Sequence, residues 1–383
     1  MKLLMVLTFY HPHWTGLTAY ARRLAEGLVR RGHEVTVLTS RYWRALPSED
    51  AHNGVRIVRL PALMRVSRGL VQPSFLWVAH RLIRESNVVQ IHTPLLESAL
   101  VTTLAAMLGK KVILTHHGDL VMPERPFDQF VERTVTGIMR QALKGAARIT
   151  IHTKDYADSS PFLRPFRDKL VYVLPPVEIP RPIPEQVAAW RRELNLDENQ
   201  LVGFAGRFVE EKGFDYLLKS IPYVLERAPN VRFVYAGEVN VVYEKFYAQW
   251  QHLVERWRDR IVLLGLLNDA QKVANFYAMC DVLALPSRTD CFPMVQAEAM
   301  LCGTPTVATD IPGLRVPVNL TQMGLLVKPQ DERALADGIV EVLAHRGKYV
   351  RNRQDIAAVF DIEKTLDEYE ELMQSLASRR AAA

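Results

Sequence analysis

The feature that most constrains the fold is a repeated alternation of short apolar runs with helical periods. Residues 2–8 and 34–39 have the pattern of buried strands, and Thr18 to Arg31 between them carries apolar residues on one helical face. Further strands are predicted at 55–59, 88–92, 111–115 and 148–152. Strands separated by helices pair in parallel through crossover connections, so the first half of the chain predicts a layered α/β sheet.

A proline-rich segment interrupts this pattern and is followed by a second series of the same kind. Residues 174–185 hold five prolines, which lack the amide hydrogen that sheets and helix interiors need, so a stiff extended linker is predicted. A helix at 185–194 follows it. The second series then has strands at 201–205, 231–236, 261–264, 282–285 and 305–308, and closing helices at 334–344 and 362–377.

The length of 383 residues suits two domains better than one. We expect an N-terminal domain at 1–178, a linker at 179–190, a second domain at 191–361 and a final helix at 362–383. The predicted fold class is α/β, with two Rossmann-like, doubly wound domains. They are expected to face each other across a cleft at the carboxyl ends of their strands, where such sheets bind ligands.

The net charge of +6 hides an asymmetry between the two halves. Residues 1–180 carry 24 basic and 14 acidic side chains, a net charge of +10, whereas residues 181–383 carry 24 and 28, a net charge of −4. This distribution argues against uniform nucleic-acid binding, and no nucleic-acid partner is expected. It predicts instead that the first half meets an anionic partner.

The excess positive charge is densest at 41–84. This stretch contains eight arginines and only two acidic residues, with bulky apolar side chains between them. Such interleaving is typical of a surface that touches anionic lipid headgroups. The alternatives are that the apolar residues belong to the core beneath solvated arginines, or that the acceptor is a soluble anion.

Targeting signals are weak. The apolar start of the chain is short and is followed by His11-Pro12-His13 in place of a cleavage site, and no run of 18 apolar residues occurs. Three cysteines without metal or redox spacing indicate reduced thiols. We therefore expect a cytoplasmic protein, peripheral at the inner face of the membrane if 41–84 binds lipid.

The strongest local motif opens the second domain, where a predicted strand ends at Gly206 and a helix starts near Phe214. Arg207 and Lys212 lie in the turn between them. Two cations at the carboxyl edge of a sheet suit a diphosphate, the arginine through paired hydrogen bonds and the lysine as a point charge. The alternative is a solvated turn in which Glu210 and its neighbour Glu211 pair with these cations.

A second motif follows the strand at 282–285. A helix is predicted to start near Pro293, so the free amides of Met294 and Val295 could bind an anion. Asp290 precedes this helix and Glu298 lies in its second turn, where carboxylates suit sugar and ribose hydroxyls. The alternative is an acid favoured by the helix dipole together with an ordinary surface glutamate.

A third group lies in the first domain. Gly16 follows the first strand at a helix start, where backbone amides can hold an anion. His116, His117 and Asp119 follow the strand at 111–115, and His92 ends the strand at 88–92. A single histidine is more often structural than catalytic, but histidines at neighbouring strand ends can donate to hydroxyls or do acid–base work.

In this order the motifs resemble those of nucleotide-sugar-dependent glycosyltransferases with two Rossmann-like domains, the GT-B fold, and in particular the retaining glycosyltransferase family 4. The resemblance spans residues 1 to about 345. It rests on Thr15-Gly16-Leu17, Arg31 to Val37, Thr115 to Asp119, Gly206-Arg207 with Lys212-Gly213, Asp290 to Met300, Gly303 to Ala308 and Gly324 to Val327.

The resemblance implies a hexosyltransferase that uses a donor such as a UDP- or GDP-hexose as substrate, with no cofactor. The implied donor-binding residues are Gly16, Arg207, Lys212, Phe292, Pro293, Met294, Val295, Glu298, Glu238 and Leu267. The implied catalytic group is His117, Asp290, Arg207 and Lys212, with His92, His116 and Asp119 on the acceptor side. The acceptor would be a hydroxyl, and the charge of the first half suggests a glycolipid or polyprenol carrier.

Three departures from the family pattern stand out: Asp290 where glutamate is usual, Thr15 where many members have a second glycine, and a segment 312–317 without glutamate. No Asp-x-Asp pair that would bridge a metal occurs, so a metal-independent reaction is expected. Two alternatives share the fold: a sugar-nucleotide epimerase or phosphorylase-like enzyme, and a non-catalytic sugar-nucleotide-binding partner. A dehydrogenase is disfavoured because no Gly-x-Gly-x-x-Gly follows a first strand.

Overall fold

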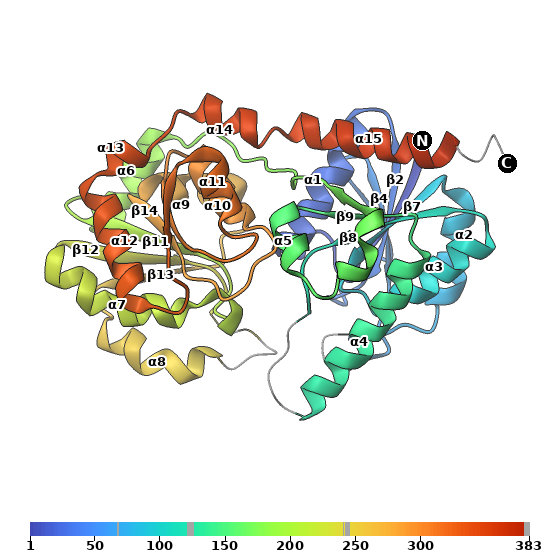
Figure 1. Cartoon of the computed structure of the whole chain (residues 1–383), viewed down its shortest axis with the longest axis horizontal. Helices are drawn as coiled ribbons and strands as arrows, with labels where there is room; N and C mark the ends of the chain where they lie inside the picture. The colour runs from blue at the N-terminus through green and yellow to red at the C-terminus, as the bar shows by residue number, and fades with distance from the viewer. Residues whose placement is uncertain (67–68, 121–125, 240, 242–245, 379–383) are drawn as a thin grey trace. The chain divides into compact units, whose positions relative to one another are not determined.

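The computed structural model describes residues 1–66, 69–120, 126–239, 241 and 246–378 (Figure 1). The chain divides into two compact units. Met1–Pro176 and Ile362–Ala383 make the first, here called the N-terminal unit, and Val177–Asp361 make the second, the C-terminal unit. Each contains a sheet with parallel strands and intervening helices, which confirms the predicted α/β class with two Rossmann-like sheets.

The N-terminal sheet has the order β10-β9-β8-β7-β1-β2-β4-β3, and every pair is parallel except β3 with β4. Its strands are β1 Lys2–Val6, β2 Glu34–Ser40, β3 Glu49–His52, β4 Val55–Leu60, β7 Val88–Thr93, β8 Lys111–His116, β9 Arg148–Ile151 and β10 Leu170–Tyr172. A separate hairpin joins β5 Met64–Val66 to β6 Gly69–Val71. Because β1 pairs with both β2 and β7, the strand order reverses beside it, the position where such sheets bind ligands.

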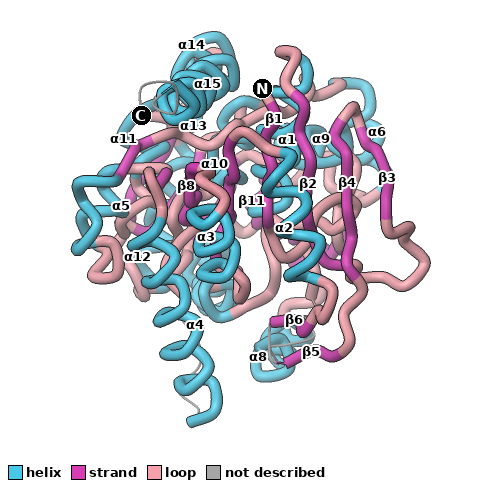
Figure 2. The backbone as a smooth tube through the Cα atoms, turned by 90° about the vertical axis from the view of Figure 1, so that its right-hand side faces the viewer, coloured by secondary structure: helices cyan, strands magenta, loops and turns pink. Residues whose placement is uncertain are grey.

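Helices pack on this sheet, and Figure 2 shows α2 and α3 over one face. They are α1 Gly16–Arg30, α2 Phe75–Glu85, α3 Ser98–Met107, α4 Pro126–Gly145, α5 Lys154–Ser159, the 3-10 turn η1 Arg164–Lys169 and α15 Ile362–Ser378. Helix α1 starts at Gly16, earlier than the predicted Thr18, because Thr15 caps it. Thr15 accepts from the Thr18 amide and Thr18 accepts from the Thr15 amide.

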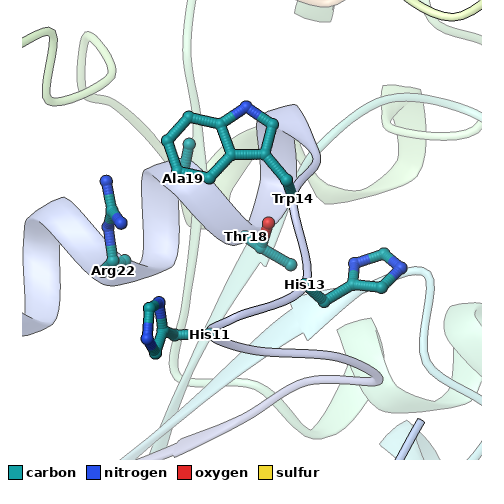
Figure 3. A pocket seen from close by; sticks show the side chains of 6 residues that line it. All are labelled: His11, His13, Trp14, Thr18, Ala19 and Arg22. Carbon is teal, nitrogen blue, oxygen red and sulfur yellow. The ribbon is translucent and has the colours of Figure 1, made fainter. Parts of the chain in front are cut away.

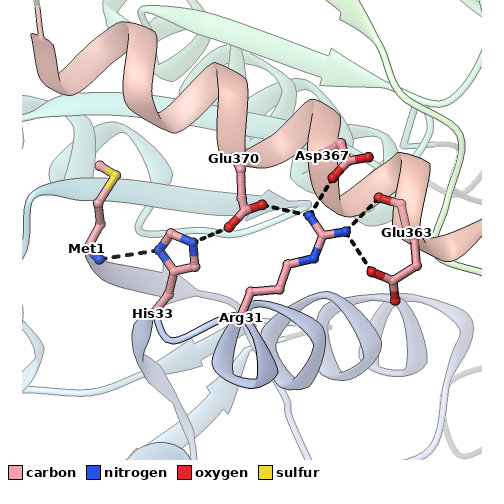
Figure 4. Close-up of polar contacts among 6 residues, drawn as sticks. All are labelled: Met1, Arg31, His33, Glu363, Asp367 and Glu370. Atoms are coloured by element: carbon pink, nitrogen blue, oxygen red, sulfur yellow. Dashed lines mark hydrogen bonds and ion pairs between the residues drawn. The ribbon is translucent and has the colours of Figure 1, made fainter.

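The last helix is bound to α1 by charge and by packing (Figure 4). The guanidinium of Arg31 reaches Glu363 and Glu370 at 2.6 Å and Asp367 at 2.7 Å. Beside these ion pairs, a methyl group on Gly27 would lie 2.7 Å from the Leu366 side chain, so the two helices are in direct contact. The chain's final helix is therefore an integral layer of the N-terminal unit.

The C-terminal sheet is wholly parallel, in the order β13-β12-β11-β14-β15-β16. Its strands are β11 Gln200–Ala205, β12 Val231–Ala236, β13 Ile261–Gly265, β14 Val282–Leu285, β15 Thr306–Thr309 and β16 Gly324–Val327. Its helices are α6 Pro184–Glu193, η2 Glu210–Lys212, α7 Phe214–Arg227, α8 Phe246–Arg256, α9 Ala270–Met279, α10 Met294–Leu301, α11 Val316–Thr321, α12 Glu332–Ala344, α13 Arg346–Tyr349 and α14 Arg353–Val359. An aromatic core around Phe204, Phe214 and Tyr235 packs between α7 and the sheet.

The stretch 41–84 divides between core and surface. Leu60, Phe75 and Leu82 are buried, whereas Trp43, Leu63, Leu76 and Trp77 are exposed. The arginines of this stretch were expected at the surface, and for Arg59 this prediction is wrong. Its side chain is 2% exposed and donates to Asp50 at 3.0 Å and to the His11 carbonyl at 2.9 Å. The backbone at Arg68 lies outside the described residues.

Candidate functional site

In the C-terminal unit, the turn after β11 is fixed by close backbone approach. Gly213 has a φ of +66°, and a Cβ there would lie 1.9 Å from the Pro286 carbonyl oxygen after β14. On the other side, a Cβ on Gly237 would lie 1.8 Å from the Gly206 carbonyl oxygen. Only glycine satisfies both positions. The turn from Gly206 to Gly213 is therefore held against the carboxyl ends of β12 and β14.

Lys212 pairs across this edge with Asp290, Nζ to Oδ2 at 2.7 Å, and the two side chains are 25% and 13% exposed. Burial by itself lowers the pKa of Lys212, but Asp290 and Glu211 more than offset that effect and hold the pKa above its ordinary value. Arg207 donates to Glu211 at 3.2 Å, as in the alternative interpretation of a charged turn. The structure thus joins Lys212 to Asp290, the pair separated by 78 residues in sequence.

The loop that carries Asp290 leads into α10, which starts at Met294 after Pro293. Among the described residues, no side chain caps this helix, and its first residues Met294 and Val295 are half-buried. Gly313 closes onto the loop, since a Cβ there would lie 2.4 Å from the Asp290 carbonyl oxygen. The helix start and a fixed carboxylate therefore lie beside Lys212, an arrangement that can bind an anion and hydroxyl groups together.

Glu298 is 7% exposed and accepts a hydrogen bond from the Tyr277 hydroxyl of α9 at 3.0 Å. Phe292 is also buried and packs edge-on against Phe360 at 6.0 Å between ring centroids. Glu238 follows β12 with an exposed side chain, and its carbonyl accepts from the Phe208 amide at 2.9 Å.

Leu267 follows β13, which is two strands away from β11 in the sheet. Its side chain is half-buried. Leu267 therefore follows a strand that is not adjacent to β11, the strand that leads into the turn at Lys212.

In the N-terminal unit, histidines gather at the carboxyl ends of three adjacent strands. His92 Nδ1 on β7 lies 2.9 Å from His117 Nε2, the residue directly after β8. The His117 ring is 5.3 Å from that of His152, which follows β9. The Tyr20 ring of α1 packs edge-on against His117 at 4.8 Å, so Gly16 starts the helix that supports this cluster.

The three clustered imidazoles are neutral at pH 7. Burial, and then neighbouring His152, lowers the pKa of His92 to about 3. Burial likewise lowers the pKa of His152 to about 4, and burial together with the other histidines holds the pKa of His117 well below 6.5. The cluster can therefore donate and accept hydrogen bonds, but it does not supply a positive charge.

His116 and Asp119 form a separate group. His116 is fully buried, and its Nε2 lies 3.0 Å from Asp119 Oδ1 while its Nδ1 lies 3.2 Å from the Thr93 hydroxyl. Ser160 donates to Asp119 as well, at 2.8 Å. The adjacent side chains of His116 and His117 thus lie in different environments, and only His117 belongs to the cluster with His92 and His152.

Sequence reasoning missed three members of this region. His152 ends the strand predicted at 148–152, just as His92 ends the strand predicted at 88–92, so the strand-end argument that singled out His92 applied to it equally. Tyr20 and Tyr369 meet through their hydroxyls at 2.6 Å, and Tyr369 also donates to Thr150 at 3.0 Å. No sequence signal connects residues that are 349 positions apart.

A shallow recess lies at the start of α1, lined by His11, His13, Trp14, Thr18, Ala19 and Arg22 (Figure 3). The Arg22 guanidinium lies 4.9 Å from the centroid of the Trp14 ring. Burial, and then His52 and the nearby arginines, lowers the pKa of His11 to about 4. The recess therefore offers one cation and neutral polar groups.

Within the described residues, no group of three or more histidine, cysteine, aspartate or glutamate side chains is arranged to hold a metal ion. The helices described here also include none with the length and apolar character that crossing a bilayer requires.

Comparison with known proteins supports the resemblance. Residues 15–176 match the family described as glycosyl transferase 4-like domain, and residues 199–345 match glycosyl transferases group 1. An uncharacterized glycosyltransferase of Methanocaldococcus jannaschii is 26% identical, with 92% of each chain covered. D-inositol 3-phosphate glycosyltransferase of Xylanimonas cellulosilytica is 28% identical, with 88% of this chain and 85% of that protein covered.

The fold is also found among solved structures. Anabaena HepE, in complex with UDP and glucose, superposes with a TM-score of 0.79 at 17% identity, covering 98% of this chain and 100% of the other. Two family matches, one on each unit, account for most of the sequence, and the sheet order and motifs agree with them. The chain therefore belongs to the family 4-type glycosyltransferases of the GT-B fold.

Proposed function

We propose that this protein transfers a hexose from a nucleotide-diphosphate sugar to a hydroxyl acceptor with retention of anomeric configuration. The observation that carries the proposal is the Lys212–Asp290 pair beside the start of α10. A diphosphate needs a cation and free amides, and the transferred sugar needs a fixed carboxylate; these groups lie together at one edge of the C-terminal sheet.

On the donor side, Arg207, Lys212 and the amides of Met294 and Val295 bind the diphosphate, and Glu298 accepts from the ribose hydroxyls. The Tyr277 hydroxyl donates to Glu298 at 3.0 Å and thereby orients the carboxylate. Asp290 holds the sugar. These roles follow from the family resemblance, and the geometry of the C-terminal unit supports them.

In the reaction, the bond between the anomeric carbon and the diphosphate oxygen breaks while the acceptor oxygen bonds to the same face of that carbon. The acceptor proton passes to a diphosphate oxygen, so no side chain needs to act as nucleophile. Lys212 and the helix amides stabilise the charge that develops on the leaving diphosphate, without a metal ion. His117, being neutral, positions a hydroxyl of the donor sugar by a hydrogen bond.

The acceptor side is the N-terminal unit. We propose a lipid- or polyprenol-linked acceptor, because α2 presents an exposed face with Leu76 and Trp77 next to Arg81 and Arg84. This α2 face, defined by those four residues, combines apolar side chains with cations as anionic membrane surfaces require. Attachment there would make the protein peripheral at the inner face of the membrane.

A soluble anionic acceptor is the second candidate, and two observations favour it. The relatives include a D-inositol 3-phosphate glycosyltransferase, whose name gives a phosphorylated acceptor. In the recess at α1, Arg22 and Trp14 lie side by side. A cation beside an aromatic face suits a phosphorylated polyol.

A thermal-shift screen of UDP-, GDP- and ADP-hexoses tests the donor. A matched donor at 100 times its Kd stabilises the protein by about 2.7 kcal/mol. Transfer is then measured with the matched donor on Lys212→Ala and Glu298→Ala. Donor binding without transfer or slow donor hydrolysis would favour a non-catalytic binding partner, and turnover of the donor without any acceptor would favour an epimerase.

Vesicle flotation at low salt separates the acceptor classes. We expect the protein to float with vesicles of phosphatidylglycerol and phosphatidylcholine but not with phosphatidylcholine alone, and Leu76→Ser to weaken flotation. Leu320→Ser is the matched control, because Leu320 has a similar exposure, 49% against 45% for Leu76, on the other unit. No lipid-dependent binding, together with stabilisation by inositol phosphate, would favour the soluble acceptor.

A further inference from the structure

The hydrogen bond between His92 and His117 joins two rings that are both neutral. The atoms are His92 Nδ1 and His117 Nε2, 2.9 Å apart, so one nitrogen carries the hydrogen and the other accepts it. A neutral imidazole has a single N–H. The choice made in this one bond therefore decides which nitrogen of His117 carries the hydrogen.

The surroundings of His92 favour one of the two arrangements. His92 is fully buried, and among the described residues its Nε2 has no hydrogen-bond partner. With the hydrogen on Nε2, an N–H donor would be buried without an acceptor, and such donors are rarer in folded proteins than unsatisfied acceptors. With the hydrogen on Nδ1, His92 donates to His117 and only a lone pair is left unmatched.

The second ring nitrogen of His117, Nδ1, has surroundings different from those of Nε2. Within the described part of the chain, its Nδ1 makes no hydrogen bond, and the side chain is half-buried. The rings around it are His152 after β9 at 5.3 Å and Tyr20 of α1 at 4.8 Å, and among the described residues His117 forms no ion pair. These neighbours fix the plane of the ring without offering Nδ1 an acceptor.

We propose that His92 is a positioning residue that donates its Nδ1–H to His117 Nε2 and thereby fixes His117 as the Nδ1–H tautomer. In that form His117 offers an N–H at Nδ1, which in the proposed function donates to a hydroxyl oxygen of the donor sugar. The role of the tautomer in transfer rests on the proposed function, whereas the tautomer itself is a property of the protein alone.

The tautomer can be measured without any variant of His92. The ¹⁵N chemical shifts of imidazole distinguish a protonated from an unprotonated ring nitrogen, and His117→Asn identifies the His117 signals among the 11 histidines. We expect His117 with Nδ1 protonated and Nε2 unprotonated between pH 6 and 8. The reverse pattern, or an equal mixture, would overturn the proposal whatever the enzyme's activity.

Three variants on β7 then test the positioning role. His92→Phe removes the hydrogen bond and keeps a ring, and His92→Asn keeps an N–H donor near the place of Nδ1. Gln90→Leu is the matched control, because Gln90 is buried on the same strand and donates to Thr115, not to His117. Near-ultraviolet circular dichroism and the unfolding temperature show whether each variant is folded.

We expect His92→Phe to lower kcat by roughly 10-fold with the donor KM changed less than about twofold, as for an interaction made mainly in the transition state. His92→Asn should recover most of the loss, and Gln90→Leu should keep kcat. In His92→Phe the acid limb of the pH profile should move to higher pH, because His92 is one of the groups that lower the pKa of His117.

The two proposals fail in different ways. Full activity of His117→Ala would contradict the role of His117 in transfer. The ¹⁵N measurement of the His117 tautomer would still test the proposal about His92 independently. An inactive His117→Ala together with a fully active His92→Phe would contradict the positioning role and leave the proposed function intact.

Discussion

The two units hold polar side chains at the carboxyl edges of similar sheets, but in opposite electrostatic states. In the N-terminal unit, burial keeps His92, His117 and His152 neutral. In the C-terminal unit, Lys212 stays charged because Asp290 lies 2.7 Å away. Burial and neighbouring histidines lower the pKa of each histidine, whereas Asp290 raises the pKa of Lys212, and this difference decides which group stays charged when buried.

The two units therefore suit different roles in binding and catalysis. Neutral imidazoles fix geometry and respond little to salt, whereas an ion pair provides charge that a bound diphosphate can share. We therefore expect the C-terminal unit to supply most of the binding energy for an anionic donor. The N-terminal unit should supply orientation.

The largest effect is expected for Lys212→Ala. This change removes the cation and leaves Asp290 with a buried, unpaired charge, so transfer should fall by about 10²–10³-fold. Steady-state transfer with the matched donor is the measurement. Lys219→Ala is the control, since Lys219 also pairs with an aspartate of the same unit, Asp215 at 3.2 Å. Equal losses in both variants would remove the special role of Lys212.

His117→Ala should come next, with a loss of about 10²-fold in kcat and little change in donor affinity. The reason is that a neutral positioning group acts on orientation and not on the charge of the diphosphate. Kinetics with isothermal titration of the donor check both numbers. His345→Ala, at an exposed histidine of the other unit, serves as control. A loss of donor affinity with unchanged kcat would reverse the assignment.

Acid should weaken the N-terminal unit through its buried histidines. His92 and His152 have pKa values of about 3 and 4 in the folded chain and an ordinary value of 6.5, so the unfolded chain binds more protons between these limits. Stability should therefore fall as the pH drops from about 6.5 to 4. The measurement is the rate of hydrogen exchange of the β7 and β9 amides as a function of pH. We expect His92→Phe to make the stability depend less on pH. A stability that rises toward pH 4 would contradict the neutral cluster.

The smallest effect is expected for Arg31→Ala, which removes three partly exposed ion pairs from α15. Because each such pair contributes about 0.2–1 kcal/mol, faster hydrogen exchange of α15 amides is expected with little change elsewhere. Lys2→Ala is the control, at an exposed pair with Glu34 on the same unit. Unchanged exchange in α15 would mean that packing at Gly27 and Leu366 holds the helix by itself.

Local patterns in the sequence predicted most of the fold. The strand at 282–285 is found at those residues, and the helix expected from 362 begins there. Errors are confined to boundaries and to short elements: the first strand ends at Val6, the predicted strand at 305–308 lies at Thr306–Thr309, and the edge strands β3 and β10 were not foreseen. Short edge strands carry too few residues for their period to be visible.

The candidate site was less predictable because it depends on contacts distant in sequence. Lys212 and Asp290 were each predicted, but nothing in their spacing indicates that they pair. His116 contacts Asp119, whereas the adjacent His117 contacts His92. The sequence does not show which of the two histidines takes which partner, because that depends on where β8 ends. Arg59 was expected at the surface because a buried arginine is rare unless it has partners such as Asp50.

The position of α15 has a consequence for how the protein is made. The N-terminal unit is composed of Met1–Pro176 and Ile362–Ala383, and the whole C-terminal unit is synthesised between them. Tyr369, which bonds to Tyr20 beside the histidine cluster, is synthesised after the whole C-terminal unit. The N-terminal unit is thus begun before the C-terminal unit and completed after it. A chain that stops before α15 would carry every predicted site residue yet lack the hydroxyl that pairs with Tyr20.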